Sequence, residues 1–142
     1  MRRVVVTGIG IVSPLGVGQD HVWNRLTNGE SGIGAITRTD VSDLPARVAG
    51  SVPYGDGSDG TFDPDAWIEK KEQRKMDTFI TYGMAAGIQA VQDSGWMPDD
   101  EEELNRTGVM IGSGIGGLPG ISEGSVTLHE RGARRISPFF IQ

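Results

Sequence analysis

Blocks of apolar residues along the chain predict short strands that lead into glycines. Residues 4–6 are consecutive valines, and the glycine turn at residues 7–10 follows them. A second apolar run at residues 107–111 precedes a glycine-rich segment at residues 112–117. Continuous runs of this kind are typical of strands that are covered on both faces. One further short strand is expected around residues 47–52.

Helical spacing is strongest between about residues 76 and 94, where apolar residues recur every three or four positions. Because its charges lie only near its ends, we expect this helix to be buried nearly all round. Gly83 and Gly87 each lower helix stability by about 1 kcal/mol relative to alanine, which indicates another backbone packed closely there. Further helical segments are predicted at residues 18–29, as an acid-rich first turn at residues 98–103, and from residue 117 to 129 or 130. Strands that alternate with helices indicate an α/β fold with a largely parallel sheet.

The C-terminal end carries the start of one more helix. Ser137 is a favourable cap and Pro138 suits the first helical position, while Phe139, Phe140 and Ile141 would form an apolar face. The sequence stops at Gln142, before such a helix has a body. We therefore expect a chain that is cut short.

Composition narrows the classes of protein to which the chain can belong. Its 142 residues make about one domain, and no apolar run approaches the ~20 residues of a membrane helix. The 22 glycines are roughly twice the usual share, which indicates turns and close backbone approaches. With no cysteine, the span has no disulfide, thiolate metal site or cysteine nucleophile. The first residues lack a signal-peptide pattern, so a cytoplasmic protein is expected.

The charge is acidic overall but unevenly distributed. A net charge of −6 argues against a nucleic-acid-binding surface, although it permits a local basic patch. Residues 70–75 hold 4 of the 13 basic residues, immediately before the longest helix. This segment is either an ordinary solvated approach to a helix or a landing patch for an acidic partner. In the second case Arg131, Arg134 and Arg135 form a possible second cluster.

The glycine-rich segment also matches a nucleotide-binding motif. Gly112, Gly114 and Gly117 have the G-x-G-x-x-G spacing, between a predicted strand and a predicted helix. No second strand with a ribose-binding acid follows, however. Close backbone packing is the alternative interpretation of these glycines.

Two other patterns have simpler explanations. Residues 120–124 spell G-x-S-x-G, but a nucleophile elbow needs a strand directly before the serine, and a helix start is predicted there. His21 and His129 are expected to be solvent-exposed on helices, without a partner at metal-ligand spacing. No metal site and no catalytic triad are predicted.

Six stretches, taken together, identify a family. These stretches are RRVVVTGIGIVSPLG at 2–16, NGESGI at 28–33, KEQRKMD at 71–77, QDSG at 92–95, IGSGIGG at 111–117 and RRISPFF at 134–140. On these stretches, the chain resembles the N-terminal part of β-ketoacyl-acyl-carrier-protein synthases, the condensing enzymes of fatty-acid synthesis, and most closely the type II elongating synthase. The loop at residues 53–66 departs from the usual pattern because it looks longer and richer in glycine and aspartate.

The resemblance implies a thiolase-like layered αβαβα fold, of which residues 1–142 are most of the N-terminal half, truncated before the catalytic cysteine. The family carries out a decarboxylative Claisen condensation with that cysteine, two histidines and a lysine, and uses no cofactor and no metal. All of these catalytic groups would lie beyond this span, and His21 and His129 are not their counterparts. The span alone is therefore predicted to be inactive, and the full-length enzyme is expected to be a homodimer.

The resemblance also implies roles for residues within the span. Lys71, Arg74, Lys75, Arg134 and Arg135 resemble the basic residues that meet acyl carrier protein. Ile115 and Phe140 resemble residues that line the acyl-chain pocket near the dimer interface. Three alternatives stay open: a polyketide or initiating condensing enzyme, a nucleotide-binding module that uses GSGIGG, and a non-catalytic carrier-binding module. No nucleic acid and no membrane partner is expected.

Overall fold

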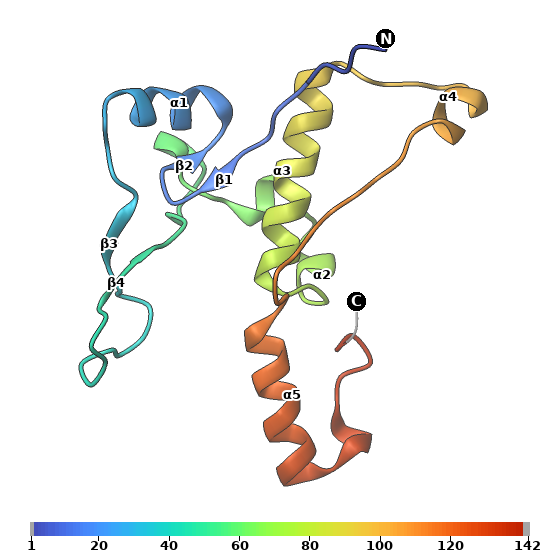
Figure 1. Ribbon diagram of the computed structural model, residues 1–142. Helices are drawn as coiled ribbons and strands as arrows, with labels where there is room; N and C mark the ends of the chain where they lie inside the picture. Colours follow the sequence, from blue (N-terminus) through green and yellow to red (C-terminus); the bar gives the residue numbers. More distant parts are fainter. Residues whose placement is uncertain (1, 141–142) are drawn as a thin grey trace. The chain divides into compact units, whose positions relative to one another are not determined.

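The computed structural model describes residues 2–140, which form two compact units. The first unit holds the described residues up to Trp67 together with Ala85–Met97. The second holds Ile68–Met84 and the described residues from Pro98 onward. The long helix α3, Thr78–Ser94, begins in the second unit and ends in the first (Figure 1). Among the described residues, no helix is long and apolar enough to cross a membrane.

The first unit contains two short antiparallel strand pairs and a helix. Its elements are β1 Val12–Ser13, β2 Gly16–Val17, α1 Gln19–Thr27, β3 Ile33–Ala35, β4 Val48–Gly50 and the 3-10 turns η1 Ser58–Gly60 and η2 Pro64–Ala66. Strand β1 pairs with β2, and β3 pairs with β4, which confirms the strand expected around residues 47–52. Val12 lies opposite Val17 in the first pair, and Ile33 lies opposite Gly50 in the second.

Helix α1 confirms the helix predicted at residues 18–29. Val22 is its buried residue, and Gly29, at φ 73°, follows the C-cap Asn28 in the left-handed region that favours glycine. Phe62 is the most deeply buried large side chain of this unit. Its ring meets the Tyr54 ring edge to face, with the centroids 5.3 Å apart.

The second unit is helical. It contains the start of α3 and the helices α2 Lys70–Gln73, α4 Glu101–Asn105 and α5 Leu118–Arg131, followed by the 3-10 turn η3 Ala133–Arg135. Asp100 caps α4 by accepting a hydrogen bond from the Glu103 N–H at 2.9 Å, and three glutamates occupy the first turn. The acid-rich helix start and the helix predicted from residue 117 are therefore confirmed.

The strands predicted at residues 4–6 and 107–111 do not form. Val4 is 95% exposed and Met110 is 98% exposed, so neither run is covered on either face. A parallel strand needs neighbours that exchange hydrogen bonds with it, and the described residues supply none to these two segments. Their sequences are strand-like, but a strand is stable only inside a ladder.

The N-terminal segment instead lies along α3 (Figure 1). The Ile9 N–H donates to the Asp93 carboxylate at 2.8 Å, and the Ile11 N–H donates to the Gln89 side chain at 3.4 Å. Gly8 and Gly10 lie so close to the α3 backbone that a Cβ on either would overlap helix atoms, among them the carbonyl oxygens of Ala90 and Ala86 respectively. The close backbone approach expected for α3 therefore exists, but on its alanine face.

The prediction that named Gly83 and Gly87 for this approach is wrong, because no described atom outside the helix's own turns lies within 4 Å of a Cβ built at either. The helix is also not buried all round. Thr81 and Ala85 are buried, whereas Met84 is 42% exposed and Val91 is 43% exposed. The apolar faces of α3 are only partly covered by the described part of the chain.

The predicted helix start at Ser137 is present as a turn. The Ser137 hydroxyl oxygen accepts from the Phe139 N–H at 3.2 Å, and the Ser137 carbonyl accepts from the Phe140 N–H at 3.1 Å. Ile141, the third residue of the expected apolar face, lies outside the described residues.

Candidate functional site

A groove in the second unit is the candidate functional site. It lies between the start of α3, the first half of α5 and the C-terminal turn, and it has a volume of about 740 Å³. Its wall combines three basic and two acidic side chains with aromatic rings and with backbone from the glycines at the start of α5. The lining includes Arg74, Lys75, Asp77, Phe79, Gly117, Gly120, Glu123, Arg135, Phe139 and Phe140.

The groove brings together members of the two basic clusters that the sequence suggested. Arg74 and Lys75 precede α3, and Arg135 ends η3 after α5, yet all three line the same groove. Lys71 and Arg134 are exposed beside them in the chain without lining it. Cations that are distant in sequence thus surround one surface, which favours an anionic partner.

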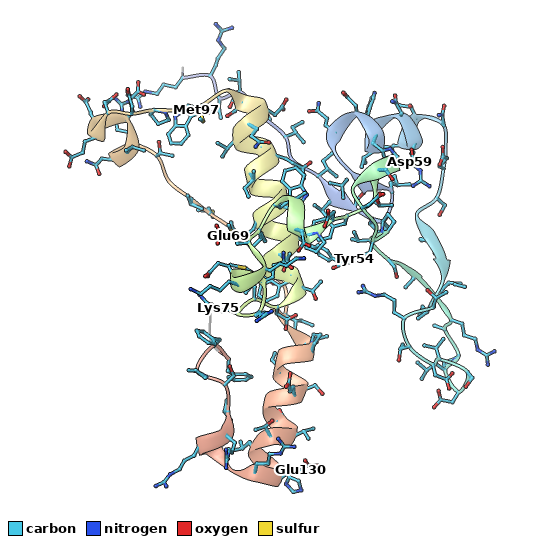
Figure 2. The ribbon with its side chains drawn as sticks, turned by 180° about the vertical axis from the view of Figure 1, so that it is seen from behind. Tyr54, Asp59, Glu69, Lys75, Met97 and Glu130 are labelled. Carbon is cyan, nitrogen blue, oxygen red and sulfur yellow. The ribbon has the colours of Figure 1, made fainter. Side chains whose placement is uncertain are left out.

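Lys75 is the most constrained of these cations. Its Nζ lies 2.6 Å from a Glu72 carboxylate oxygen and 5.9 Å from the centroid of the Phe139 ring. Figure 2 shows Lys75 where the segment before α3 lies next to the C-terminal turn. The hydrogen bond from Lys75 lowers the pKa of Glu72 below its ordinary value, and the positive charges of Lys75 and Lys71 act in the same direction. One predicted docking cation is therefore already paired within the chain.

Asp77 links the beginnings of two helices on the groove wall. Its backbone carbonyl accepts the N–H of Ile80 at 3.0 Å, so it stands at the start of α3. Its carboxylate accepts the N–H of Gly120 at 3.0 Å, in the first turn of α5. A pyrophosphate bound by the glycine-rich segment would need this same helix end. An aspartate there argues against the nucleotide-binding alternative, as does the missing strand before the segment.

The two predicted acyl-pocket residues are placed differently. Phe140 lines the groove, and its ring lies so close to Gly124 of α5 that a Cβ on the glycine would overlap it. Ile115 is 74% exposed and does not line the groove. The structure therefore does not bring Ile115 and Phe140 into one cavity within residues 2–140.

The G-x-S-x-G pattern and the two histidines do not form a catalytic or metal site among the described residues. Residues 120–124 lie inside α5 without a preceding strand, so no nucleophile elbow forms. His129 is exposed as expected. His21 is not: it packs against Gly16 and Gly60, and its Nε2 is buried without a hydrogen-bond partner among the described residues. The described part of the chain holds no group of three potential metal ligands.

Comparison with known proteins places these features in a family. The model described as "Beta-ketoacyl synthase, N-terminal domain" matches residues 1–142. The chain belongs to the β-ketoacyl synthase family. The 3-oxoacyl-(acyl-carrier-protein) synthase 2 of Rhizobium meliloti (strain 1021) is 56% identical over 141 residues, which cover 99% of this chain and 34% of the relative. Its counterpart in Vibrio cholerae serotype O1 is 48% identical over 140 residues, 99% of this chain and 32% of the relative.

Solved structures of β-ketoacyl synthases share the fold. The ishigamide ketosynthase/chain length factor is 27% identical with a TM-score of 0.72, over 98% of this chain and 33% of that chain. A β-ketoacyl synthase from Burkholderia phymatum STM815 is 27% identical with a TM-score of 0.71, over 99% of this chain and 33% of that one. The predicted thiolase-like α/β fold class is therefore confirmed. The chain spans about a third of the length of these relatives.

Sequence reasoning missed two acidic residues at this site: Asp77, which lines the groove, and Glu72, which pairs with the groove residue Lys75. Asp77 could have been found as the start of α3, since aspartate is a favoured helix cap. Nothing local indicates that its carboxylate reaches a residue 43 positions later. Glu72 could have been found as an acid three residues before Lys75, a spacing that permits an ion pair.

Proposed function

We propose that the chain is the N-terminal part of a 3-oxoacyl-acyl-carrier-protein synthase of fatty-acid elongation, and that it ends before the catalytic cysteine. The observation that carries this proposal is the 56% identity to a 3-oxoacyl-(acyl-carrier-protein) synthase 2 over nearly the whole chain. The basic groove adds physical support, because an acidic carrier protein is the kind of partner that such a surface attracts. The cytoplasmic location and the homodimer belong to the same proposal.

The proposed reaction has two parts. A cysteine thiolate attacks the acyl thioester and releases the carrier thiol, which leaves an acyl-enzyme. Malonyl carrier protein then loses carbon dioxide, and the resulting enolate attacks the acyl-enzyme, forms the carbon–carbon bond and frees the cysteine. This span contains no cysteine, so it supplies scaffold and binding surfaces while other parts of the enzyme supply the nucleophile, the histidines and the lysine.

We assign carrier docking to Lys71, Arg74, Lys75, Arg134 and Arg135. All except Lys75 are exposed, and members of both clusters line one groove. Surface charges of this kind raise the encounter rate and orient the partner without deep burial. We assign acyl-chain contacts to Ile115 and Phe140. Phe140 has support from its place in the groove wall, and Ile115 from its position in the IGSGIGG stretch.

Charge reversal tests the docking assignment. In the full-length enzyme, Arg74→Glu and Arg135→Glu should each raise the KM for carrier-bound substrate at least tenfold, while kcat/KM for a small thioester stays near the wild-type value. Arg106→Glu is the matched control, because Arg106 is exposed in the same unit and does not line the groove. An equal loss on both substrates, or an equal effect in the control, contradicts the assignment.

A polyketide condensing enzyme is the second candidate, because one structural neighbour is a ketosynthase/chain length factor. That neighbour is 27% identical, against 56% for the Rhizobium meliloti relative, which favours fatty-acid elongation. Analysis of the products made from malonyl carrier protein separates the two. A β-ketoacyl product from a single condensation on a saturated primer fits elongation, and repeated condensation without reduction fits the alternative.

A further inference from the structure

The start of α5 depends on a carboxylate from elsewhere in the chain. Gly117 is the N-cap residue and offers no side-chain cap, and Pro119 has no N–H to donate. The N–H of Gly120, in the first turn, therefore has no acceptor within the helix. The Asp77 carboxylate accepts from it at 3.0 Å. The positive end of this 14-residue helix makes an anion favourable at this place.

Two glycines leave the room that this carboxylate occupies. A Cβ on Gly117 would overlap the Asp77 carboxylate, and a Cβ on Gly120 would lie 3.0 Å from its Oδ2 atom. Gly117 has a φ of −86°, which any residue can adopt, and Gly120 lies inside the helix. Backbone conformation therefore does not require glycine at either position. The space taken by Asp77 explains both.

We infer that Asp77 is a positioning residue that fixes Gly117, where the glycine-rich segment enters α5, and the first turn of α5 against the start of α3. The Asp77 backbone carbonyl accepts from the first turn of α3, and its carboxylate accepts from the first turn of α5. One residue therefore holds both helix ends on the groove wall. The segment that enters α5 carries Ile115, two residues before the N-cap. Resting on the proposed function, this inference makes Asp77 a determinant of how Ile115 meets the acyl chain.

A double-mutant cycle in the full-length enzyme tests the contact itself. Asp77→Ala and Gly117→Ala should each lower Tm by about 2 °C or more. The double variant should lose much less than the sum, because alanine at position 117 displaces a carboxylate that the first substitution has already removed. Asp100→Ala is the matched control: it removes a carboxylate that caps α4 at 2.9 Å and should be additive with Gly117→Ala. Additive Tm shifts for Asp77 and Gly117 overturn the inference.

Anion rescue gives a second readout that a general loss of packing would not produce. Asp77→Gly leaves the first turn of α5 without its anion, so formate should raise the Tm of this variant more than that of the wild type at equal ionic strength. The Asp100→Ala control gives the background effect of formate on a helix cap. Equal responses of the Asp77→Gly variant and the wild type overturn the inference.

The selectivity of the enzyme for acyl primers of different length tests the role of Asp77 in the reaction. Asp77→Ala should change the ratio of kcat/KM between short and long acyl primers at least threefold, a ratio in which any common effect on carrier docking cancels. Asp77→Asn keeps an oxygen that accepts from Gly120 and should restore most of the wild-type profile. An unchanged profile in Asp77→Ala overturns the positioning role. A wild-type enzyme that does not condense refutes the proposed function, while the Tm cycle still decides the inference.

Discussion

At the residue scale, some charged side chains at the groove are already paired within the chain, and others are not. Glu72 holds Lys75, and Asp77 holds the start of α5. Arg74 and Arg135 line the groove as exposed cations. The cations of KEQRKMD are therefore not equivalent, although the sequence presents them as one basic cluster. In the proposed docking, an acidic partner competes with Glu72 for Lys75.

Glu72→Gln should strengthen carrier binding. The Lys75 hydrogen bond lowers the pKa of Glu72 below its ordinary 4.5, so the fold favours the ionised acid. The Glu72–Lys75 pair therefore stabilises the fold at pH values above the ordinary pKa of Glu72. This stabilisation is lost as the pH falls through the lowered pKa. At neutral pH Glu72 is ionised and competes for Lys75, and its removal should lower the KM for carrier-bound substrate by about twofold, in line with the small contribution of an ion pair at the protein surface.

The control for this prediction is Glu69→Gln. Glu69 is exposed at the N-cap of α2, so its substitution changes the net charge equally without touching the Lys75 pair. Steady-state kinetics with carrier-bound and small thioesters at low salt provide the measurement. Should Glu69→Gln lower the KM as much as Glu72→Gln does, the gain comes from overall charge and not from the freed lysine.

At the element scale, close packing around α3 depends on glycines of its neighbour. Gly8 and Gly10 bring the N-terminal segment onto the alanine face of the helix, while Gly83 and Gly87 within the helix meet open space. The periodic pattern identified the helix correctly. It could not say which face a neighbour would cover, because alanine and glycine both permit a close approach.

This difference predicts opposite effects of the same substitution. Gly10→Ala puts a methyl group into the Ala86 carbonyl and should destabilise the fold by about 1–3 kcal/mol, the usual cost of overpacking. Gly83→Ala adds a methyl group in open space within a helix and should stabilise it by about 0.5–1 kcal/mol. Thermal melts of both variants, compared with wild type, check the sign. A lower Tm for Gly83→Ala would contradict the open face.

At the scale of the whole molecule, the strand-like runs at residues 4–6 and 107–111 have no strand partner among residues 2–140. Val4 is 95% exposed, Val109 is 87% exposed and Met110 is 98% exposed. Unpaired apolar runs of this kind are templates for association. The relatives that the chain matches are about three times as long, since it covers 34% and 32% of them.

The 142-residue chain produced by itself should therefore expose apolar surface. We expect it to bind a hydrophobic dye such as ANS and to self-associate at micromolar concentration, as measured by light scattering after gel filtration. The double variant Val5→Lys and Met110→Lys should reduce both signals, because charge blocks edge-to-edge pairing. The double variant Asn24→Lys and Gln92→Lys, which adds the same charge at exposed positions outside the two runs, is the matched control. A monomer without dye binding would contradict the prediction.

The sequence by itself determined the local elements and the family. Helices α1, α3, α4 and α5 follow from spacing, caps and glycine ends, which are properties of residues within a turn or two of one another. The thiolase-like fold and the family followed from short stretches such as KEQRKMD and IGSGIGG, since their residues and order are legible without coordinates.

Only the tertiary structure decided which residues distant in sequence contact one another. It brought Arg135 to the groove of Arg74 and Lys75, placed the Asp77 carboxylate on α5, and left the runs at residues 4–6 and 107–111 without a ladder. The physical reason is common to all three. A cap or a helical period is a local interaction, whereas a shared groove, a long-range carboxylate contact and a strand each depend on a partner distant in sequence, which no local pattern specifies.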